Sequence, residues 1–256
     1  DPSAMSDEPA VLAEACPRAR VIVNPKRSAA AAEAVECFNA QIIILDDGFQ
    51  HRGIARDMDI LAVDCTCPFG YERLLPAGLL REAPASLKRA SAVVLTRCDM
   101  VPETELELIE QRLRETNGAL VLARSVHRPV NVQIAEGKLS LAELKNKRVF
   151  VFCGIGNPQA FAATVEGLGA GIAGYRFFND HHVYTIDQLD EIDAEADHCG
   201  ADMLLTTAKD RARINPHMQR NLKIPLGAVN IKLEITSGGE SLKALIEHAV
   251  ADKMTS

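Results

Sequence analysis

The residues best suited to chemistry lie in the run Ile42-Ile43-Ile44-Leu45-Asp46-Asp47-Gly48-Phe49-Gln50-His51. A buried apolar strand that ends in two carboxylates would place Asp46 and Asp47 at the carboxyl edge of a parallel sheet, where open α/β folds bind their ligands. In nucleotide phosphotransferases a strand-end aspartate of this kind holds Mg²⁺. A turn that merely ends the strand is the alternative, because Gly48 tolerates a positive φ.

A second polar group occupies Asn179-Asp180-His181-His182-Val183-Tyr184-Thr185, between an expected strand and an expected helix. Adjacent side chains point in different directions, so we expect at most one of the two histidines to share a site with Asp180. A histidine oriented by a carboxylate can act as a general base or support one. The alternative is a solvated loop whose polar groups cap the following helix.

Three further motifs have simple structural explanations. Ser6-Asp7-Glu8-Pro9 is typical of a helix start, with an N-cap residue before a first-turn proline. Cys153-Gly154-Ile155-Gly156-Asn157-Pro158 could let a phosphate approach a helix N-terminus, but its last two residues already explain a helix cap. Thr206-Thr207-Ala208-Lys209-Asp210 could bind an anion or begin a helix. The sequence contains no G-x-x-x-x-G-K-[ST] loop, so a site for Mg²⁺ would lack the usual phosphate cradle.

The elements that must position these residues are short apolar runs alternating with helical stretches, the pattern of parallel sheets built from βαβ units. We expect strands at residues 21–23, 42–45, 60–63, 92–95, 120–123, 149–153, 171–176, 203–205 and 228–233. We expect helices at residues 28–38, 103–116, 158–168, 186–199 and 239–251. Residues 125–147 interrupt this rhythm with an isolated hairpin, which we interpret as a linker. The predicted fold class is α/β, with two α/β/α sandwich units and mainly parallel sheets.

Composition excludes several classes of protein. The 256 residues are 47% hydrophobic and 25% charged, as in ordinary soluble globular proteins. A net charge of −7 without a basic cluster disfavours a nucleic-acid partner. Seven cysteines without a C-x-x-C pair favour reduced thiols in a cytosolic compartment. The chain begins Asp1-Pro2-Ser3, and its first expected strand comes late, so we expect that an N-terminal portion is missing.

In the order of its motifs, the sequence resembles the tetraacyldisaccharide 4′-kinases of lipid A biosynthesis. The resemblance rests on the blocks at residues 46–52, 54–60, 68–70, 73–78, 80–82, 87–90, 152–158, 180–182 with Tyr184, and 206–210. The family carries a phosphate loop upstream of its Asp-Glu-Pro motif, and six residues precede that motif here. Three positions also depart from the family pattern, namely Ser6, Tyr71 and Ala208.

The resemblance implies ATP-dependent phosphorylation of the 4′-hydroxyl of an acylated glucosamine disaccharide 1-phosphate, which gives lipid IVA at the cytoplasmic face of the bacterial inner membrane. It implies a P-loop-kinase-like domain truncated at its N-terminus (residues 1–125), a two-stranded linker hairpin (126–147) and a C-terminal α/β domain (148–256). ATP and Mg²⁺ are the implied cofactors. Contact with the membrane surface would be peripheral, mainly through the missing N-terminal segment. Without that segment the chain is not expected to phosphorylate efficiently by itself.

The resemblance also implies roles for particular residues. Asp7 would be the base for the sugar hydroxyl, supported by His181 across the domain cleft. The nucleotide and metal would be held by Asp46, Asp47 and Gly48, with Glu8 as a further ligand of Mg²⁺. The substrate side of the cleft would be lined by Gln50, His51, Arg81 and Glu82.

Two other functions stay open at this point. Asp180-His181-His182 is also the signature of DHH-type metal-dependent phosphoesterases, which need two Mn²⁺-type sites within about 4 Å of each other. The chain could also be a non-catalytic remnant that binds a lipid-linked sugar phosphate without turnover.

Overall fold

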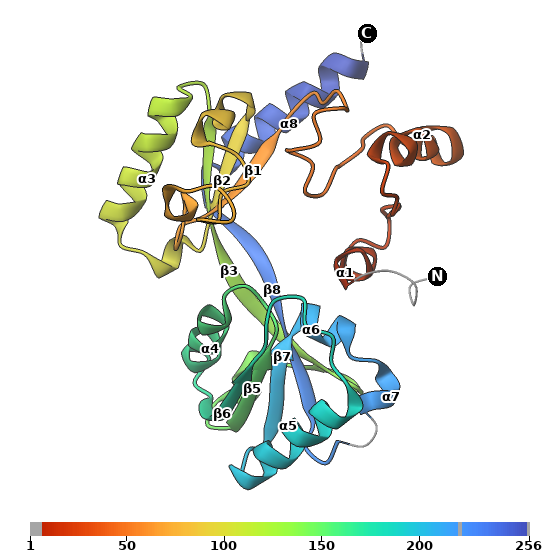
Figure 1. The fold of residues 1–256 in the computed structure, drawn as a ribbon, viewed down its shortest axis with the longest axis vertical. Coiled ribbons are helices and arrows are strands. Elements are labelled where there is room, and N and C mark those ends of the chain that lie inside the picture. Colours follow the sequence, from red (N-terminus) through yellow and green to blue (C-terminus); the bar gives the residue numbers. More distant parts are fainter. Residues whose placement is uncertain (1–6, 220–221, 255–256) are drawn as a thin grey trace. The chain divides into compact units, whose positions relative to one another are not determined.

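The computed structural model describes residues 7–219 and 222–254 (Figure 1). Its helices are α1 (Asp7–Ala15), α2 (Arg27–Phe38), α3 (Glu103–Thr116), α4 (Pro158–Gly167), α5 (Ile186–His198), α6 (Ala208–Arg213), α7 (Pro216–Gln219) and α8 (Gly239–Met254). Its strands are β1 (Ile60–Asp64), β2 (Ala92–Thr96), β3 (Val121–Ile134), β4 (Gly137–Leu139), β5 (Arg148–Cys153), β6 (Gly171–Phe177), β7 (Met203–Thr207) and β8 (Leu226–Ser237). Among these residues, no helix is both long and apolar enough to span a bilayer.

The chain divides into two compact units, and neither is a continuous stretch of sequence. Unit 1 comprises Asp1–Val23 and Arg128–Lys232, and unit 2 comprises Asn24–His127 and Leu233–Ser256. Strands β3 and β8 each contribute residues to both units. The functional division expected at residues 1–125, 126–147 and 148–256 stays a prediction.

Unit 1 is a three-layer α/β/α sandwich around a mainly parallel sheet. Its strands follow the order β3-β8-β7-β5-β6, and β5 pairs in parallel with both β6 and β7. Val149 and Val151 of β5 face a buried cluster with α4, whereas Phe150 and Phe152 face a second cluster with α5. This alternation follows from the two-residue period of a strand, and it explains why β5 is apolar without interruption.

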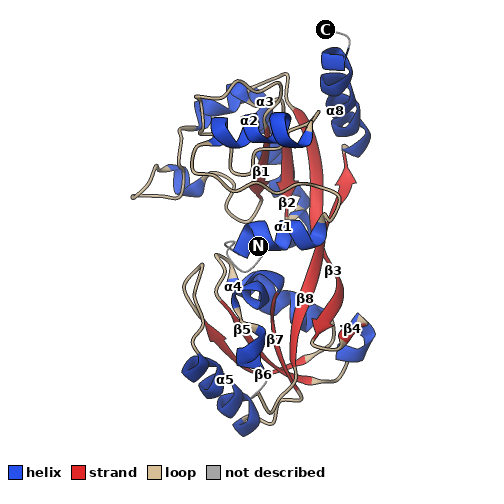
Figure 2. Cartoon of the chain, turned by 90° about the vertical axis from the view of Figure 1, so that its right-hand side faces the viewer, coloured by secondary structure: helices blue, strands red, loops and turns tan. Residues whose placement is uncertain are grey.

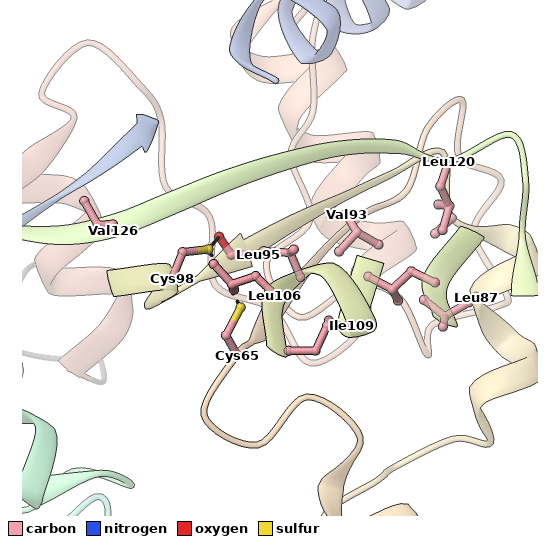
Figure 3. Packing of buried hydrophobic residues seen from close by; sticks show 11 residues of the cluster. Cys65, Leu87, Val93, Leu95, Cys98, Leu106, Ile109, Leu120 and Val126 are labelled. Carbon is pink, nitrogen blue, oxygen red and sulfur yellow. Dashed lines mark hydrogen bonds between the residues drawn. The ribbon is translucent and has the colours of Figure 1, made fainter. Parts of the chain in front are cut away.

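Unit 2 contains the parallel strands β1 and β2 and the first half of β3, in the order β1-β2-β3. Helix α3 covers one face of them through Leu106, Ile109 and Leu113, which recur at helical spacing and are at most 4% exposed. They pack with Val93 and Leu95 of β2 in the cluster drawn in Figure 3. The expected helix at residues 103–116 is confirmed at both ends.

The expected hairpin is confirmed, because β3 and β4 pair antiparallel from Val132 with Leu139 to Ile134 with Gly137 (Figure 2). It is not isolated, however, because β3 continues without interruption from Val121. Strand β3 also has β8 as a neighbour in the sheet. Within unit 1 Asn131 bonds Asn230, and within unit 2 Arg124 accepts from Thr236, so β3 and β8 run in opposite directions.

Two expected strands are wrong. Residues 21–23 and 42–45 form no regular structure, and Ile42, Ile43 and Ile44 are 61%, 41% and 89% exposed. An apolar run becomes a strand only when a neighbouring strand satisfies its backbone N–H and C=O groups. Among the described residues no strand pairs with either run, so hydrophobicity and β-branching predicted an element that its surroundings do not complete.

Candidate active site

The Asp46-Asp47-Gly48 motif forms a turn in which Asp46 and Asp47 are exposed and Gly48 is buried. Asp47 adopts a left-handed conformation with φ of 47°, which an aspartate tolerates better than most residues. Its Oδ2 accepts a hydrogen bond of 2.6 Å from Nη1 of Arg81. The strand that was expected to present the two carboxylates is absent, so the turn interpretation fits this structure. The contact nonetheless brings together two of the predicted site residues, which are 34 positions apart.

Arg89 joins the same turn to the following segment. Its Nη2 donates to Glu82 Oε2 at 2.7 Å, and its guanidinium lies 4.2 Å from the centroid of the Phe49 ring. Hydrogen bonds from Ser86 and then Arg89 lower the pKa of the Glu82 carboxyl. Glu82 is therefore an anion fixed by its own neighbours, and its folded structure favours the ionised form.

Gln50 and His51 extend from this turn as exposed residues. The backbone that carries them is fastened by Arg56, whose guanidinium donates to the carbonyl oxygens of His51 at 2.6 Å and Phe49 at 3.4 Å. Asp59 holds the guanidinium at 2.8 Å. Arg56 thus shapes the segment that the sequence singled out, although its own role was not predicted.

A second group of predicted residues lies in unit 1, in the loops that follow β5, β6 and β7. These strands are parallel, so their carboxyl ends meet at one edge of the sheet (Figure 1). The β6–α5 loop carries Asp180 and His181, whose side chains are 52% and 57% exposed. An exposed polar loop at this edge has the position at which α/β sheets bind ligands.

Asp210 is the centre of a buried hydrogen-bond network beneath this loop. It is fully buried at the start of α6 and accepts from Gly154 N at 3.0 Å, the Tyr184 hydroxyl at 3.0 Å and the Thr207 hydroxyl at 2.6 Å. Arg213 adds an ion pair of 3.2 Å. A buried carboxylate is tolerable only when it is satisfied in this way. Burial and the adjacent Asp210 raise the pKa of the Tyr184 phenol, so it stays a donor.

The two adjacent histidines have different surroundings, as expected. His182 stacks on Phe178 with a centroid distance of 4.3 Å, and its Nε2 lies 3.0 Å from Gln188 Oε1. His181 turns the other way, with φ of 59°, and its Nδ1 lies 3.2 Å from Arg213 Nη2. Only His181 is therefore placed with Asp180, whose Oδ2 is 3.9 Å from His181 Nε2.

Polar residues at the starts of three helices act as N-caps, which is the structural explanation considered in the sequence analysis. Asn157 caps α4 by accepting from Ala160 N at 3.1 Å, and Pro158 follows in the first turn. Thr185 forms a capping box with Gln188 at the start of α5. Thr207 caps α6 by accepting from Asp210 N. The helix-cap explanation thus accounts for these three positions.

The residues predicted to hold Mg²⁺ do not form a complete metal site in the described part of the chain. Asp46 and Asp47 are consecutive in a turn, and Asp47 is engaged by Arg81. The side chain of Glu8 lies outside the described residues, as does that of Asp7. Within residues 7–219 and 222–254, no group of three His, Cys, Asp or Glu side chains could hold a metal ion.

The predicted residues therefore divide between the two units. Asp46, Asp47, Gly48, Gln50, His51, Arg81 and Glu82 belong to unit 2, whereas Asp7, Glu8 and His181 belong to unit 1. Within unit 1 helix α1, which begins with Asp7 and Glu8, lies against α6. Nothing in the sequence pointed to Arg213, because an arginine three residues after Asp210 is ordinary on a helix. Asp210 could have been found from its position three residues after Thr207, the spacing of a helix N-cap and its partner.

A family model described as "Tetraacyldisaccharide-1-P 4'-kinase", LpxK, matches residues 1–251. The chain belongs to the LpxK family. This confirms the family resemblance of the motifs at residues 46–52, 152–158 and 180–182. The DHH-type phosphoesterase is not favoured by the match. The metal ligands that such an enzyme needs are also not arranged for it, because His182 stacks on Phe178 and its Nε2 contacts Gln188 Oε1.

Relatives of the LpxK family are similar along nearly the whole chain. A tetraacyldisaccharide 4'-kinase of Anaeromyxobacter dehalogenans strain 2CP-1 is 35% identical, over 96% of this chain and 65% of the relative. One from Anaeromyxobacter sp. strain Fw109-5 is 39% identical over 96% and 66%. One from Syntrophus aciditrophicus is 32% identical over 97% and 67%. The chain thus spans about 65% of the length of the first curated relatives.

The fold is also similar to a solved LpxK structure. The crystal structure of the "apo" form of LpxK from Aquifex aeolicus in complex with ATP matches with a TM-score of 0.67 and 25% identity. The match covers 96% of this chain and 71% of that one. The expected α/β class with mostly parallel strands is confirmed by this similarity and by the strand pairing.

Proposed function

We propose that this chain forms part of a kinase that transfers the γ-phosphoryl group of ATP to the 4′-hydroxyl of a tetraacyldisaccharide 1-phosphate, giving lipid IVA. The observation that carries the proposal is the family match over residues 1–251, with relatives named tetraacyldisaccharide 4'-kinase at 35% identity. The Aquifex aeolicus relative was solved in complex with ATP, which supports ATP as the phosphoryl donor.

His181 and Asp7 are the proposed pair for activation of the sugar hydroxyl. His181 is exposed at the carboxyl edge of the unit 1 sheet, and Arg213 of α6 contacts its ring. Helix α1, which begins at Asp7, lies against that same α6. A carboxylate with an imidazole beside it is a suitable general base for phosphoryl transfer, which otherwise requires mainly positioning and charge neutralisation.

The acidic turn of unit 2 is the place where we propose that the phosphate charge is neutralised. Asp46 and Asp47, with Gly48 beside them, would supply carboxylate ligands for Mg²⁺, which neutralises phosphate charge when bound. Arg81 Nη1 donates a hydrogen bond of 2.6 Å to Asp47 Oδ2. A guanidinium is also a good phosphate ligand. Gln50, His51, Arg81 and Glu82 would contact the acceptor or the transferred group.

The acceptor that we propose is an acylated lipid, so the reaction would take place at a membrane surface. We propose the cytoplasmic face of the bacterial inner membrane, with peripheral contact. ATP is a cytoplasmic metabolite, and the sugar phosphate headgroup is the polar end of the lipid, which makes this surface the one where both substrates meet.

The proposal is tested by phosphate transfer in the full-length natural protein, with labelled ATP and a tetraacyldisaccharide 1-phosphate in detergent. We expect label at the 4′ position. We expect Asp7→Ala or His181→Ala to lower kcat by about 10²–10⁴, the usual contribution of a general base. His198→Ala is the matched control, because His198 is exposed at the end of α5 and away from the loops of the site.

Two outcomes would contradict this function, and another would contradict the roles of Asp7 and His181. Absence of labelled lipid with intact, folded protein would contradict the kinase itself. Unchanged kcat in both variants would remove Asp7 and His181 from the mechanism. Lipid binding without turnover would favour the non-catalytic alternative.

A further inference from the structure

Arg213 links the buried network of unit 1 to the exposed ring of His181. Its Nη1 donates to the Gly154 carbonyl oxygen at 2.8 Å and to Asp210 Oδ1 at 3.2 Å. Its Nη2 lies 3.2 Å from His181 Nδ1. The Arg213 side chain is 7% exposed and that of Asp210 is fully buried. The guanidinium is therefore held by the protein interior, and only its far edge reaches the loop.

The chemistry of this contact determines where the proton of the imidazole lies. A guanidinium has five N–H donors and no acceptor, and it stays protonated in proteins. His181 Nδ1 must therefore accept the hydrogen bond from Arg213, so this nitrogen carries no proton. In a neutral imidazole the single proton is then on Nε2.

Hydrogen bonds also hold the backbone of the loop at His181. His181 N donates to the Gly154 carbonyl oxygen at 3.2 Å and to Asp180 Oδ1 at 3.0 Å. The left-handed φ of 59° turns its side chain away from His182, which packs on Phe178. The Gly154 carbonyl oxygen accepts from both His181 N and Arg213, so the two partners share one anchor.

We propose that Arg213 is a positioning residue that locks His181 in the Nε2–H tautomer. His181 then offers a hydrogen-bond donor and cannot take up a proton at Nδ1 while Arg213 occupies that lone pair. Insofar as this bears on catalysis, it rests on the proposed kinase function. There it means that His181 acts as a hydrogen-bond donor through Nε2–H, and that the sugar proton is taken up by a group other than His181 Nδ1.

The first test is the tautomer itself. The chain is labelled with ¹⁵N-histidine and its ring nitrogens are observed by NMR near pH 8, well above the ordinary imidazole pKa of about 6.5. The His181 signals are identified by their loss in His181→Gln. We expect an unprotonated Nδ1 and a protonated Nε2. A protonated Nδ1 in the parent protein would overturn the proposal without any variant of Arg213.

The second test removes the donor. In Arg213→Met we expect a mixture of both tautomers at His181, whereas Arg213→Lys should keep Nε2–H because an ammonium is also only a donor. Arg148→Met is the matched control, since Arg148 donates to the Cys199 carbonyl oxygen elsewhere in unit 1. An unchanged spectrum in a folded Arg213→Met would overturn the proposal. If that variant does not fold, the parent and Arg213→Lys spectra decide, and Nδ1–H in either one overturns it.

The catalytic consequence is read separately. In the full-length protein we expect Arg213→Met to lower kcat by about 10–10²-fold, which is what a slight misplacement of a reacting group costs, with the acceptor KM changed by less than about threefold. Arg148→Met should keep the parent kcat. An unaltered kcat in Arg213→Met would remove Arg213 from positioning. If the parent itself proves inactive as a kinase, the proposed function fails, whereas the tautomer result stands on its own.

Discussion

At the scale of single residues, the best defined feature is the carboxylate of Asp210. It is fully buried, and its oxygens accept from Gly154 N, the Tyr184 and Thr207 hydroxyls and Arg213. Gly154 and Tyr184 lie in the loops after β5 and β6, Thr207 is the last residue of β7, and Arg213 lies in α6. One side chain thus connects the separate segments that make up this edge of the sheet. A buried charge is costly unless each lone pair is used, which makes every donor matter.

Tyr184→Phe tests the weight of one such donor. The phenol donates to Asp210 Oδ1 at 3.0 Å, and its removal leaves that oxygen one partner short. We expect the free energy of unfolding to fall by about 1.5–3 kcal/mol, the range for a hydrogen bond to a charged group, as measured by urea denaturation. Tyr175→Phe, at a side chain that is 65% exposed, should change it by less than about 0.5 kcal/mol. Equal losses of unfolding free energy in the two variants would mean that the hydrogen bond from Tyr184 to Asp210 does not contribute to stability.

At the scale of elements, the loops after β5 and β6 approach so closely that one position excludes a side chain. A Cβ on Gly154 would lie 2.8 Å from the Cβ of His182 and 3.0 Å from the carbonyl oxygen of Asn179. Gly154 thus allows the β6–α5 loop to close over the β5–α4 loop. The glycine that had been considered for phosphate approach has a packing role in this structure.

Gly154→Ala should therefore be destabilising by about 1–3 kcal/mol, the usual cost of inserting a methyl group into a packed site. Gly167→Ala is the same substitution where nothing lies within 4 Å, at the end of α4, and it should be neutral or stabilising by up to about 1 kcal/mol. Thermal and urea unfolding of both variants measure the difference. Similar effects in the two would argue against the close approach at Gly154.

At the scale of the whole molecule, the chain has separate hydrophobic cores in its two units. The core of unit 2 is built on β2 and α3, whereas unit 1 has a core on each face of β5 and β7. The fully buried leucines Leu95 of β2 and Leu204 of β7 each belong to one of them. Damage to one core should therefore be felt mainly in its own unit.

Hydrogen exchange checks this independence. We expect Leu95→Ala to lower the protection of β2 amides by about 2–5 kcal/mol, the usual cost of Leu→Ala in a core, and to affect β5 and β7 much less. Leu204→Ala should show the reverse pattern. Uniform loss of protection across both units in either variant would mean that the chain unfolds as one cooperative body.

Many of the helices and strands, and the family, could be predicted from the local sequence. Helix α3 was predicted to the residue, because its apolar positions have helical spacing and its surroundings add nothing that contradicts them. Strands β5 and β7 were predicted because their uninterrupted apolar runs suit burial on both faces. The motif order also predicted the family, which the match over residues 1–251 confirms.

The sequence by itself determined the α/β class, the main helices and strands and the family. These depend on periodicity and on short motifs, which are local. Only the tertiary structure decided that residues 42–45 form no strand and that Arg213 reaches His181. Each of these depends on a partner far away in the chain: a pairing strand for the first, and a side chain 32 residues further on for the second. Hydrogen bonding and packing are satisfied in space, so no pattern of neighbouring residues could have shown them.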